Sequence, residues 1–372
     1  MSHPLYIGLM CGTSLDAIDV ALLATEPEIK LLAAADYAFP GDLRNDLMAL
    51  CLDGDQEIER LGRADRQLAA TLAGAVNDFL QKQGLKAEHI TAIGSHGQTI
   101  RHRPHDGQRS AADSFTLQIG DPNTIAELTG ITTVADFRRR DIAAGGQGAP
   151  LVPAFHSAAF AAPGRDRVVA NIGGMANISI LCGDGSVSGF DTGPGNVLMD
   201  SWIQRCRKLR YDRNGNWAAS GKANPDLVAL LLADPYYRQL PPKSTGREHF
   251  SLASIDHLLR QFSDLAPQHI QASLLELTAR SLCEAITEAS LDSAEVFLCG
   301  GGAANRQLVS RIEALLPDSL VSSSSRLGIA PDWVEAAAFA WLAQQTLDHR
   351  PGNVAAVTGA RGPRILGGIY PA

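Results

Sequence analysis

Three glycine-centred turns contain the residues best suited to hold an anion. In the first, Gly12-Thr13-Ser14, glycine lets the backbone approach an anion closely and the two hydroxyl residues add donors. The second is Asp191-Thr192-Gly193-Pro194-Gly195-Asn196, and the third is Gly300-Gly301-Gly302. A strand-to-helix turn offers free amides to phosphate, and a triple glycine lets a flat base lie against the backbone. One such turn is weak evidence because turns often need glycine, but three together indicate a nucleotide site.

Two carboxylates are candidates for proton transfer. Asp191 ends a predicted buried strand, which gives its side chain a fixed direction from which it could act as a general base. The alternative is that it caps the following helix or holds a metal ion. Glu335 lies in an apolar helical stretch, where a buried carboxylate needs a partner. It either positions a water molecule or pairs with an arginine.

Other polar residues could bind hydroxyl or carboxylate groups. His96 and Gln98 flank a glycine at the end of a predicted strand, where they could bond hydroxyl groups or simply stabilise the turn. The three arginines at 138–140 would ordinarily form a solvated run. Because they follow Asp136 and precede a glycine-rich loop, we expect one of them, Arg139, to bind an anionic group through its guanidinium fork.

The hydrophobic pattern places these residues at the ends of strands and helices. The first half predicts strands at 5–10, 17–24, 29–38, 91–95, 115–119 and 132–135, and helices at 42–52, 58–83 and 122–130. The second half predicts strands at 168–171, 176–181, 186–190, 294–299 and from 320, and helices at 197–208, 271–290, 304–316 and 332–345. Each half begins with three strands, which indicates a duplication.

The length of 372 residues exceeds one ordinary domain. A stretch rich in glycine, alanine and proline at 143–153 breaks the pattern between the halves. We therefore expect two α/β lobes, an N-terminal one over residues 1–140 and a C-terminal one over residues 141–372. In an alternative division, the final segment packs back on the first lobe.

Composition restricts the partners and the location that we expect. The 40 acidic and 32 basic side chains give a net charge of -8, which argues against a nucleic-acid partner and fits a cytoplasmic protein. The six cysteines include no close pair, so neither a zinc site nor a disulfide framework is predicted. No stretch reaches the roughly 18 apolar residues of a membrane helix, and we expect neither membrane insertion nor secretion.

Seven segments of the sequence carry specific motifs, and they are Gly8 to Asp16, Ser95 to Thr99, Asp136 to Arg138, Gly145 to Leu151, Asn171 to Gly174, Asp191 to Asn196 and Lys243 to Glu248. Together these segments resemble the anhydro-N-acetylmuramic acid kinase family, a branch of the actin, sugar kinase and heat-shock-70 superfamily. The resemblance implies an actin-like ATPase fold, in which two duplicated ribonuclease-H-like domains surround a central nucleotide cleft. It also implies an ATP-dependent kinase that opens the 1,6-anhydro ring of 1,6-anhydro-N-acetylmuramic acid with water and phosphorylates O6, in peptidoglycan recycling.

The resemblance also implies roles for individual residues. Asp191 would deprotonate the water that attacks the anomeric C1 while O6 attacks the γ-phosphorus, and Glu335 is the second catalytic candidate. A homodimer would suit the family. The expected sugar contacts are His96, Gln98, Asp136 and Arg139, the last one facing the lactyl carboxylate. The expected ATP-binding residues are Gly12, Thr13, Ser14, Leu15, Asp16, Ala17, Ile18, Asp19, Gly193, Gly195, Asn196, Gly300, Gly301, Gly302 and Asn305.

Mg²⁺ is expected with ATP because the transferring phosphate needs a divalent counter-charge. Many superfamily members carry an aspartate two residues before the first-turn glycine, where this chain has Met10. The ion would then be held mainly by phosphate and water, with Asp16, Asp19 and Asp191 as the nearby carboxylates. For Asp16, a role in the turn itself is an equal alternative.

Two other activities are compatible with the same nucleotide site. A conventional sugar or amino-sugar kinase would phosphorylate a free hydroxyl group without consuming water. A nucleotide-driven switch would hydrolyse ATP without any sugar. Labelled water and the sugar dependence of ATP consumption distinguish these activities from the ring-opening reaction.

Overall fold

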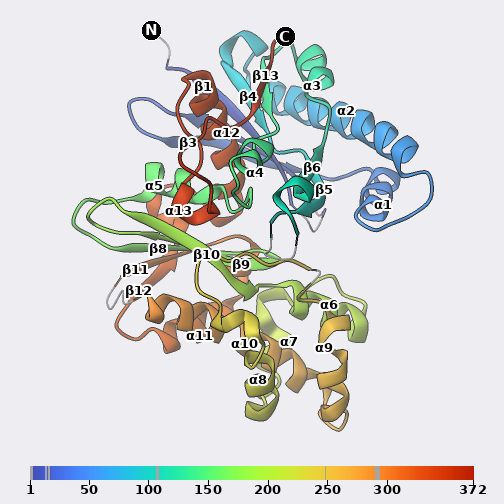
Figure 1. Cartoon of the computed structure of the whole chain (residues 1–372), viewed down its shortest axis with the longest axis vertical. Helices are drawn as coiled ribbons and strands as arrows, with labels where there is room; N and C mark the ends of the chain where they lie inside the picture. The colour runs from blue at the N-terminus through green and yellow to red at the C-terminus, as the bar shows by residue number, and fades with distance from the viewer. Residues whose placement is uncertain (1–2, 13–14, 16, 106–108, 248, 290–293) are drawn as a thin grey trace. The chain divides into compact units, whose positions relative to one another are not determined.

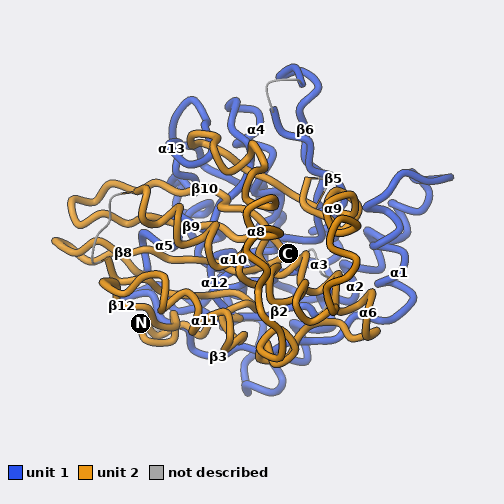
Figure 2. The backbone as a smooth tube through the Cα atoms, turned by 90° about the horizontal axis from the view of Figure 1, so that it is seen from below, with its two compact units in different colours: residues 1–159, 333–372 blue, residues 160–332 orange. Residues whose placement is uncertain are grey.

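The computed structural model describes residues 3–12, 15, 17–105, 109–247, 249–289 and 294–372. The chain forms two compact units, which are residues 1–159 with 333–372 (unit 1) and residues 160–332 (unit 2), as Figure 2 shows. Unit 1 therefore contains both ends of the chain, whereas unit 2 is one continuous stretch. The expected division after residue 140 differs from these units, because residues 141–159 and 333–372 fold with the first part of the chain.

Unit 1 is built on a six-stranded sheet with the order β13-β7-β4-β1-β2-β3. Strands β1, β2 and β3 form an antiparallel meander, β4 and β7 run parallel to β1, and β13 pairs antiparallel with β7 at the edge. The strands are β1 (Leu5–Cys11), β2 (Ile18–Ala24), β3 (Lys30–Tyr37), β4 (Ala92–Ser95), β7 (Thr133–Ala135) and β13 (Gly368–Tyr370).

Alternating residues of β1 face different helices, as expected for a strand in a covered sheet. Ile7 and Leu9 are fully buried in a core that includes residues of α1 and α2. A hairpin of β5 (Gln98–Arg103) and β6 (Phe115–Ile119) stands apart from the main sheet. The helices of this part are α1 (Gly41–Leu50), α2 (Glu57–Gln83), α3 (Pro122–Thr129), α4 (Arg139–Ala143), α5 (Val152–Phe160), α12 (Val334–Leu347) and α13 (Ala355–Thr358).

Helix α12 lies directly against the backbone of the unit 1 sheet, and Figure 1 shows it in red beside β1. A Cβ atom on Gly8 in β1 would overlap the carbonyl oxygen of Ala336, and one on Gly94 in β4 would overlap that of Phe339. The helix is rich in alanine and is buried on nearly every side, which allows this close approach. Two glycines in neighbouring strands therefore form the seat of α12.

Unit 2 repeats the strand order of unit 1. Its five-stranded sheet has the order β10-β9-β8-β11-β12. This order matches β3-β2-β1-β4-β7 of unit 1, both in the order in which the strands follow one another along the chain and in their parallel or antiparallel directions. The expected duplication is confirmed by these two matching sheets, and each is the ribonuclease-H-like α/β arrangement. The strands are β8 (Arg167–Ile172), β9 (Met175–Leu181), β10 (Val187–Pro194), β11 (Glu295–Cys299) and β12 (Leu320–Ser323).

The helices of unit 2 enclose a second apolar core around α10, whose buried face packs against the sheet and against α11. They are α6 (Val197–Arg207), α7 (Asn216–Ala219), α8 (Pro225–Leu232), α9 (Leu252–Leu259), α10 (Pro267–Glu288) and α11 (Arg306–Leu315). Within the described parts of both units, no helix combines the length and the apolar character needed to cross a bilayer.

Several element boundaries differ from those that the sequence predicts. The strand expected at 186–190 continues to Pro194 as β10, because a bulge between Asp191 and Gly193 lets pairing with β9 resume. Helix α10 starts earlier than expected, with Pro267 in its first turn. The helix expected over 304–316 is preceded by a 3-10 turn at Gly301–Ala304 and starts at Arg306.

The seat of α12 yields a prediction for stability. We expect Gly8→Ala and Gly94→Ala each to lower the free energy of unfolding by about 1–3 kcal/mol or more, because a methyl group would push α12 off the sheet. Gly74→Ala is the matched control, since a Cβ there meets nothing within 4 Å and alanine favours the helix by about 1 kcal/mol. Urea unfolding measures all three, and equal stability of the variants would contradict the close-contact interpretation.

Candidate active site

The first glycine turn follows β1 in unit 1. Its described part is fixed by two hydrogen bonds, from the Leu15 amide to the Gly12 carbonyl (3.0 Å) and from Arg44 Nε to the Leu15 carbonyl (2.9 Å). Leu15 has a positive φ of 52°, and its side chain is buried in the core together with that of Ile18. These two expected ATP-binding residues therefore offer only their backbone to a ligand. Thr13, Ser14 and Asp16 lie outside the described residues.

Two further expected ATP-binding residues follow this turn. Ala17 is half-buried, and Asp19 lies at the start of β2, half-buried and opposite Met10 of β1. The charge on Asp19 contributes to the raised pKa of the Cys11 thiol, although burial contributes more. Asp19 is therefore close to the point where β1 ends and the first turn begins.

His96 is engaged on both sides of its ring. Its Nδ1 lies 2.8 Å from the Gly97 carbonyl oxygen, and its Nε2 accepts from Nε of Arg138 at 3.1 Å. This arrangement requires the neutral tautomer with the proton on Nδ1. Burial, assisted by the Arg138 charge, holds the pKa of His96 well below its usual range. To bind a sugar hydroxyl, His96 would have to give up one of these bonds, so its geometry is that of a support for Arg138.

The arginine run separates into different environments because α4 begins within it. Arg138 is half-buried and also donates to the Gly148 carbonyl (2.8 Å), which ties it to the glycine-rich loop. Arg139 is exposed and lies 3.4 Å from a carboxylate oxygen of Asp136, measured from its Nε. The structure thus brings together the two expected substrate residues Asp136 and Arg139. Burial raises the pKa of Asp136, and the Arg139 charge opposes that change.

The β5–β6 hairpin carries buried polar atoms without partners among the described residues. Gln98 is 1% exposed, and its Nε2 donates to the Thr99 carbonyl while its Oε1 has no such partner. Nε2 of His102 and Oε1 of Gln118 are also buried and have no hydrogen-bond partner among the described residues. Burial and the charges of Arg138 and Arg103 lower the pKa of His102 to about 4. Buried polar atoms normally have partners, so these atoms are suited to a polar ligand.

Sequence reasoning missed a buried carboxylate that organises the glycine-rich loop. Asp141 is fully buried and accepts hydrogen bonds from the Gly148 amide (2.8 Å), Asn353 Nδ2 (2.7 Å) and Thr358 Oγ1 (2.8 Å). It joins this loop to the C-terminal segment of unit 1. The signal in the sequence was hidden because Asp141 directly follows three arginines, where an exposed ion pair is the ordinary expectation.

In unit 2, Asp191 lies at the bulge of β10 and is 8% exposed. The Thr245 amide donates to its carboxylate oxygen Oδ2 (2.9 Å), and the Tyr236 hydroxyl donates to its backbone carbonyl (2.6 Å). Gly193 follows with a φ of 139°, a conformation that favours glycine, and a Cβ there would lie 2.8 Å from the Tyr237 ring. The bulge therefore fixes both the position and the direction of Asp191.

The second and third glycine turns meet at Ile172 in unit 2. Asn196 Nδ2 donates to the Ile172 carbonyl (3.0 Å), and a Cβ on Gly300 or Gly302 would press against Ile172. A Cβ on Gly195 would likewise overlap the Gly173 carbonyl oxygen. These glycines are needed for close backbone packing, which places two of the expected ATP-binding turns side by side.

Other residues complete this region of unit 2. Asn305 caps α11 by accepting from the Leu308 amide (3.1 Å), so its side chain has a structural role. Asn171 was missed as a site residue; its buried Oδ1 has no hydrogen-bond partner among the described residues and lies where a Cβ on Gly300 would be. Gly301 is exposed and open, since a Cβ there meets only Asn196 Nδ2 at 4.0 Å.

Glu335 belongs to unit 1. It is half-buried in the first turn of α12, directly before Ala336, whose carbonyl packs on Gly8. A carboxylate in the first turn of a helix is favoured by the helix dipole. The seat of α12 on the sheet thus also determines where Glu335 lies relative to β1.

The carboxylates of Asp19 in unit 1 and of Asp191 in unit 2 each fit Mg²⁺ as one ligand beside phosphate and water. Among the described residues, no group of three or more His, Cys, Asp or Glu side chains could hold a metal ion. Mg²⁺ bound with a nucleotide usually takes one or two carboxylates together with phosphate and water, and Asp19 and Asp191 have the required chemistry. The chemistry of these two side chains is therefore compatible with an ion that binds together with ATP.

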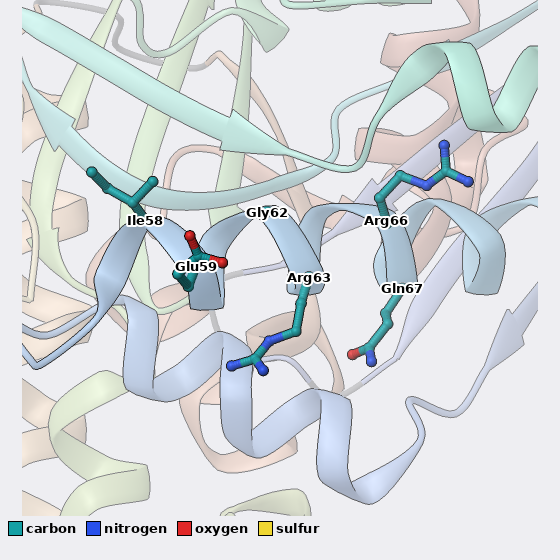
Figure 3. A pocket seen from close by; sticks show the side chains of 6 residues that line it. All are labelled: Ile58, Glu59, Gly62, Arg63, Arg66 and Gln67. Carbon is teal, nitrogen blue, oxygen red and sulfur yellow. The ribbon is translucent and has the colours of Figure 1, made fainter.

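A surface pocket elsewhere contains none of the expected site residues. Figure 3 shows that its lining side chains come from one stretch of α2, and Arg66 there also lies 3.6 Å from Asp121. The pocket is open, and it offers neither a glycine turn nor a buried carboxylate. Its lining residues are Ile58, Glu59, Gly62, Arg63, Arg66 and Gln67.

Two matching ribonuclease-H-like sheets with glycine turns at their strand ends define the fold class, which is the duplicated actin-like ATPase fold. The sequence model for "Anhydro-N-acetylmuramic acid kinase" matches residues 4–372, and the chain belongs to this family. A relative of that name from Pseudomonas paraeruginosa is 50% identical over 372 residues and covers all of both chains. One from Thiobacillus denitrificans is 51% identical over 370 residues, 99% of this chain and 97% of its own. The expected family is thereby confirmed, and the chain is a kinase.

Two solved structures show a distant likeness to this chain. The activator of 2-hydroxyisocaproyl-CoA dehydratase from Clostridium difficile aligns with a TM-score of 0.46 and 12% identity, covering 93% of this chain and 96% of that one. A ROK family glucokinase from Streptomyces griseus aligns with a TM-score of 0.40 and 13% identity, covering 91% and 99%.

The three hydrogen bonds of Asp141 predict that even its nearly isosteric replacement by asparagine destabilises the protein. Asp141→Asn replaces one acceptor oxygen by a donor that must face another donor, because both carboxylate oxygens accept hydrogen bonds. We expect the free energy of unfolding to fall by about 1–3 kcal/mol. Asp46→Asn, at an exposed position of α1, is the control and should change it little. If thermal and urea unfolding gave the same stability for Asp141→Asn and Asp46→Asn, Asp141 would not have the structural role described.

Proposed function

We propose that the chain converts 1,6-anhydro-N-acetylmuramic acid, ATP and water into N-acetylmuramic acid 6-phosphate and ADP, as a step in peptidoglycan recycling. The full-length match to the family carries this proposal. The carboxylate of Asp191, which the Thr245 amide holds in one direction, also supports the proposal. Ring opening by water needs a general base that is directed at the water molecule. ATP use fits the family and the paired glycine turns of unit 2.

In this proposal, Asp191 removes a proton from a water molecule. The water oxygen bonds to C1 of the sugar as the C1–O6 bond breaks, and the released O6 bonds to the γ-phosphorus as ADP leaves. The proton stays on Asp191 until product release. Glycine turns supply backbone amides to the phosphates without side-chain obstruction. Glu335, at the start of α12, would help to orient the water.

Gln98 and the pair Asp136–Arg139 supply the proposed sugar contacts. Oε1 of Gln98 is a buried acceptor for a hydroxyl or amide of the sugar. The ion pair with Asp136 uses Nε of Arg139, so its Nη groups remain suited to the lactyl carboxylate.

Asp19 would hold Mg²⁺ together with phosphate and water, and that ion neutralises phosphate charge when bound. We also propose that the chain acts in the cytoplasm as a homodimer, in line with its family.

Labelled water tests the ring opening. In H₂¹⁸O, we expect one label on C1 of the product and none in the transferred phosphate, when the product is analysed before its anomeric hydroxyl exchanges. Turnover that leaves C1 unlabelled would instead identify a conventional sugar kinase.

The Asp191→Asn variant tests the general base. It should lower kcat by about 10²–10⁴-fold while nucleotide affinity is retained. Asp226→Asn, at an exposed position of α8, is the control and should leave kcat unchanged.

Arg139 predicts discrimination between two substrates. We expect Arg139→Ala to raise KM for the lactyl-bearing sugar about 10–100-fold. KM for the anhydro-N-acetylglucosamine analogue should stay unchanged, because this sugar carries no carboxylate. Arg140→Ala is the matched control because Arg140 is the exposed neighbour on the same helix. Unchanged discrimination in steady-state kinetics would remove Arg139 from the substrate site.

A further inference from the structure

The segment that holds Asp191 is closed on itself by its own side chains. It runs from a 3-10 turn at Pro235–Arg238 to the start of α9. At its base, His249 Nε2 lies 3.0 Å from a carboxylate oxygen of Asp234, and the rings of Tyr236 and Phe250 meet edge to face at 5.5 Å. Loops packed in this way keep a defined shape on a rigid scaffold.

Lys243 lies inside this loop and is 8% exposed. Its Nζ donates to the carbonyls of Tyr237 (3.2 Å) and Tyr236 (3.4 Å), and it lies 4.9 Å from the Tyr236 ring centroid and 5.4 Å from that of Phe190. Burial lowers the pKa of Lys243, which the charge of Glu288 partly opposes. An ammonium group is costly to bury, and here carbonyl oxygens and ring faces replace its water.

The same loop makes three hydrogen bonds to Asp191. The Asp191 amide donates to the Lys243 carbonyl (3.2 Å), the Tyr236 hydroxyl donates to the Asp191 carbonyl, and the Thr245 amide donates to Oδ2. Phe190, whose ring faces the ammonium group, is the residue directly before Asp191. The buried charge and the carboxylate are therefore attached to the same short pieces of backbone.

We propose that Lys243 is a positioning residue for Asp191. Its ammonium group draws together the Tyr236–Tyr237 carbonyls and the Phe190 ring, and this fixes the loop whose Thr245 amide directs the carboxylate. The inference rests on the proposed function, in which Asp191 is the general base. A displacement of about 1 Å in a reacting group can cost about 100-fold in rate, so loosening this loop should act on kcat.

Lys243→Met removes the charge and keeps an unbranched apolar chain. We expect kcat to fall about 10–100-fold, with KM for ATP and nucleotide affinity within twofold of the unchanged protein. The solvent deuterium isotope effect on kcat should increase, because proton removal from water becomes slower. A loss of folded protein alone would not change that isotope effect. Lys222→Met, at an exposed position of unit 2, is the matched control.

A double-mutant cycle with Asp191→Asn decides how Lys243 acts. If Lys243 works through Asp191, the double variant should have the kcat of Asp191→Asn alone. Losses that multiply in the double variant would overturn the proposal. Wild-type activity in Asp191→Asn by itself would instead overturn the assignment of the base, so the two failures are distinguishable.

Tyr236→Phe provides the second variant if Lys243→Met does not fold. It keeps the ring beside the ammonium group and removes only the hydroxyl that donates to the Asp191 carbonyl. The expected result is again a lower kcat, an unchanged nucleotide affinity and no further loss in the Asp191→Asn background. Wild-type kcat and isotope effect in Tyr236→Phe would contradict the role of this loop.

Discussion

The contact between α12 and the bare backbone of β1 and β4 is the constraint on which unit 1 depends. Only glycine at positions 8 and 94 lets the helix carbonyls approach the strands so closely. The contact fixes the helix that carries Glu335 with respect to β1, the strand that leads into the first glycine turn. Backbone contacts of this kind cannot be relieved by a change of side-chain rotamer, so the helix has little freedom to move relative to the two strands.

Unit 2 uses the same device at its own glycine turns. Gly195 packs against the Gly173 carbonyl, and Gly300 and Gly302 pack against Ile172, so two turns from distant parts of the sequence share one small area of backbone. Asp191 is placed differently, by a bulge and a loop rather than by glycine packing. Backbone surfaces thus serve the proposed phosphate contacts, whereas a side-chain cluster serves the proposed proton transfer.

Most strands of both units could be predicted from the sequence because apolar runs and glycine turns are local signals, and the repeated order follows from the duplication. Strand β5 was missed, because its residues alternate with arginine and histidine and form no apolar run. The bulge at Asp191 could not, since it depends on pairing with β9. Strand β13 is three residues long and carries no periodicity. Arg138 and Arg139 look alike in the sequence, and only the start of α4 separates a half-buried side chain from an exposed one. Asp141 was hidden in the same way.

Unit 1 takes α12, α13 and the edge strand β13 from residues 333–372, which follow the whole of unit 2 in the chain. During synthesis, the first sheet must therefore leave the ribosome with the glycine-lined face of β1 and β4 uncovered. Unit 2 is continuous and has its complete core available before α12 has been made. The nascent chain is thus expected to finish its middle portion first and its beginning last, which is the reverse of the usual N-to-C order of domain folding.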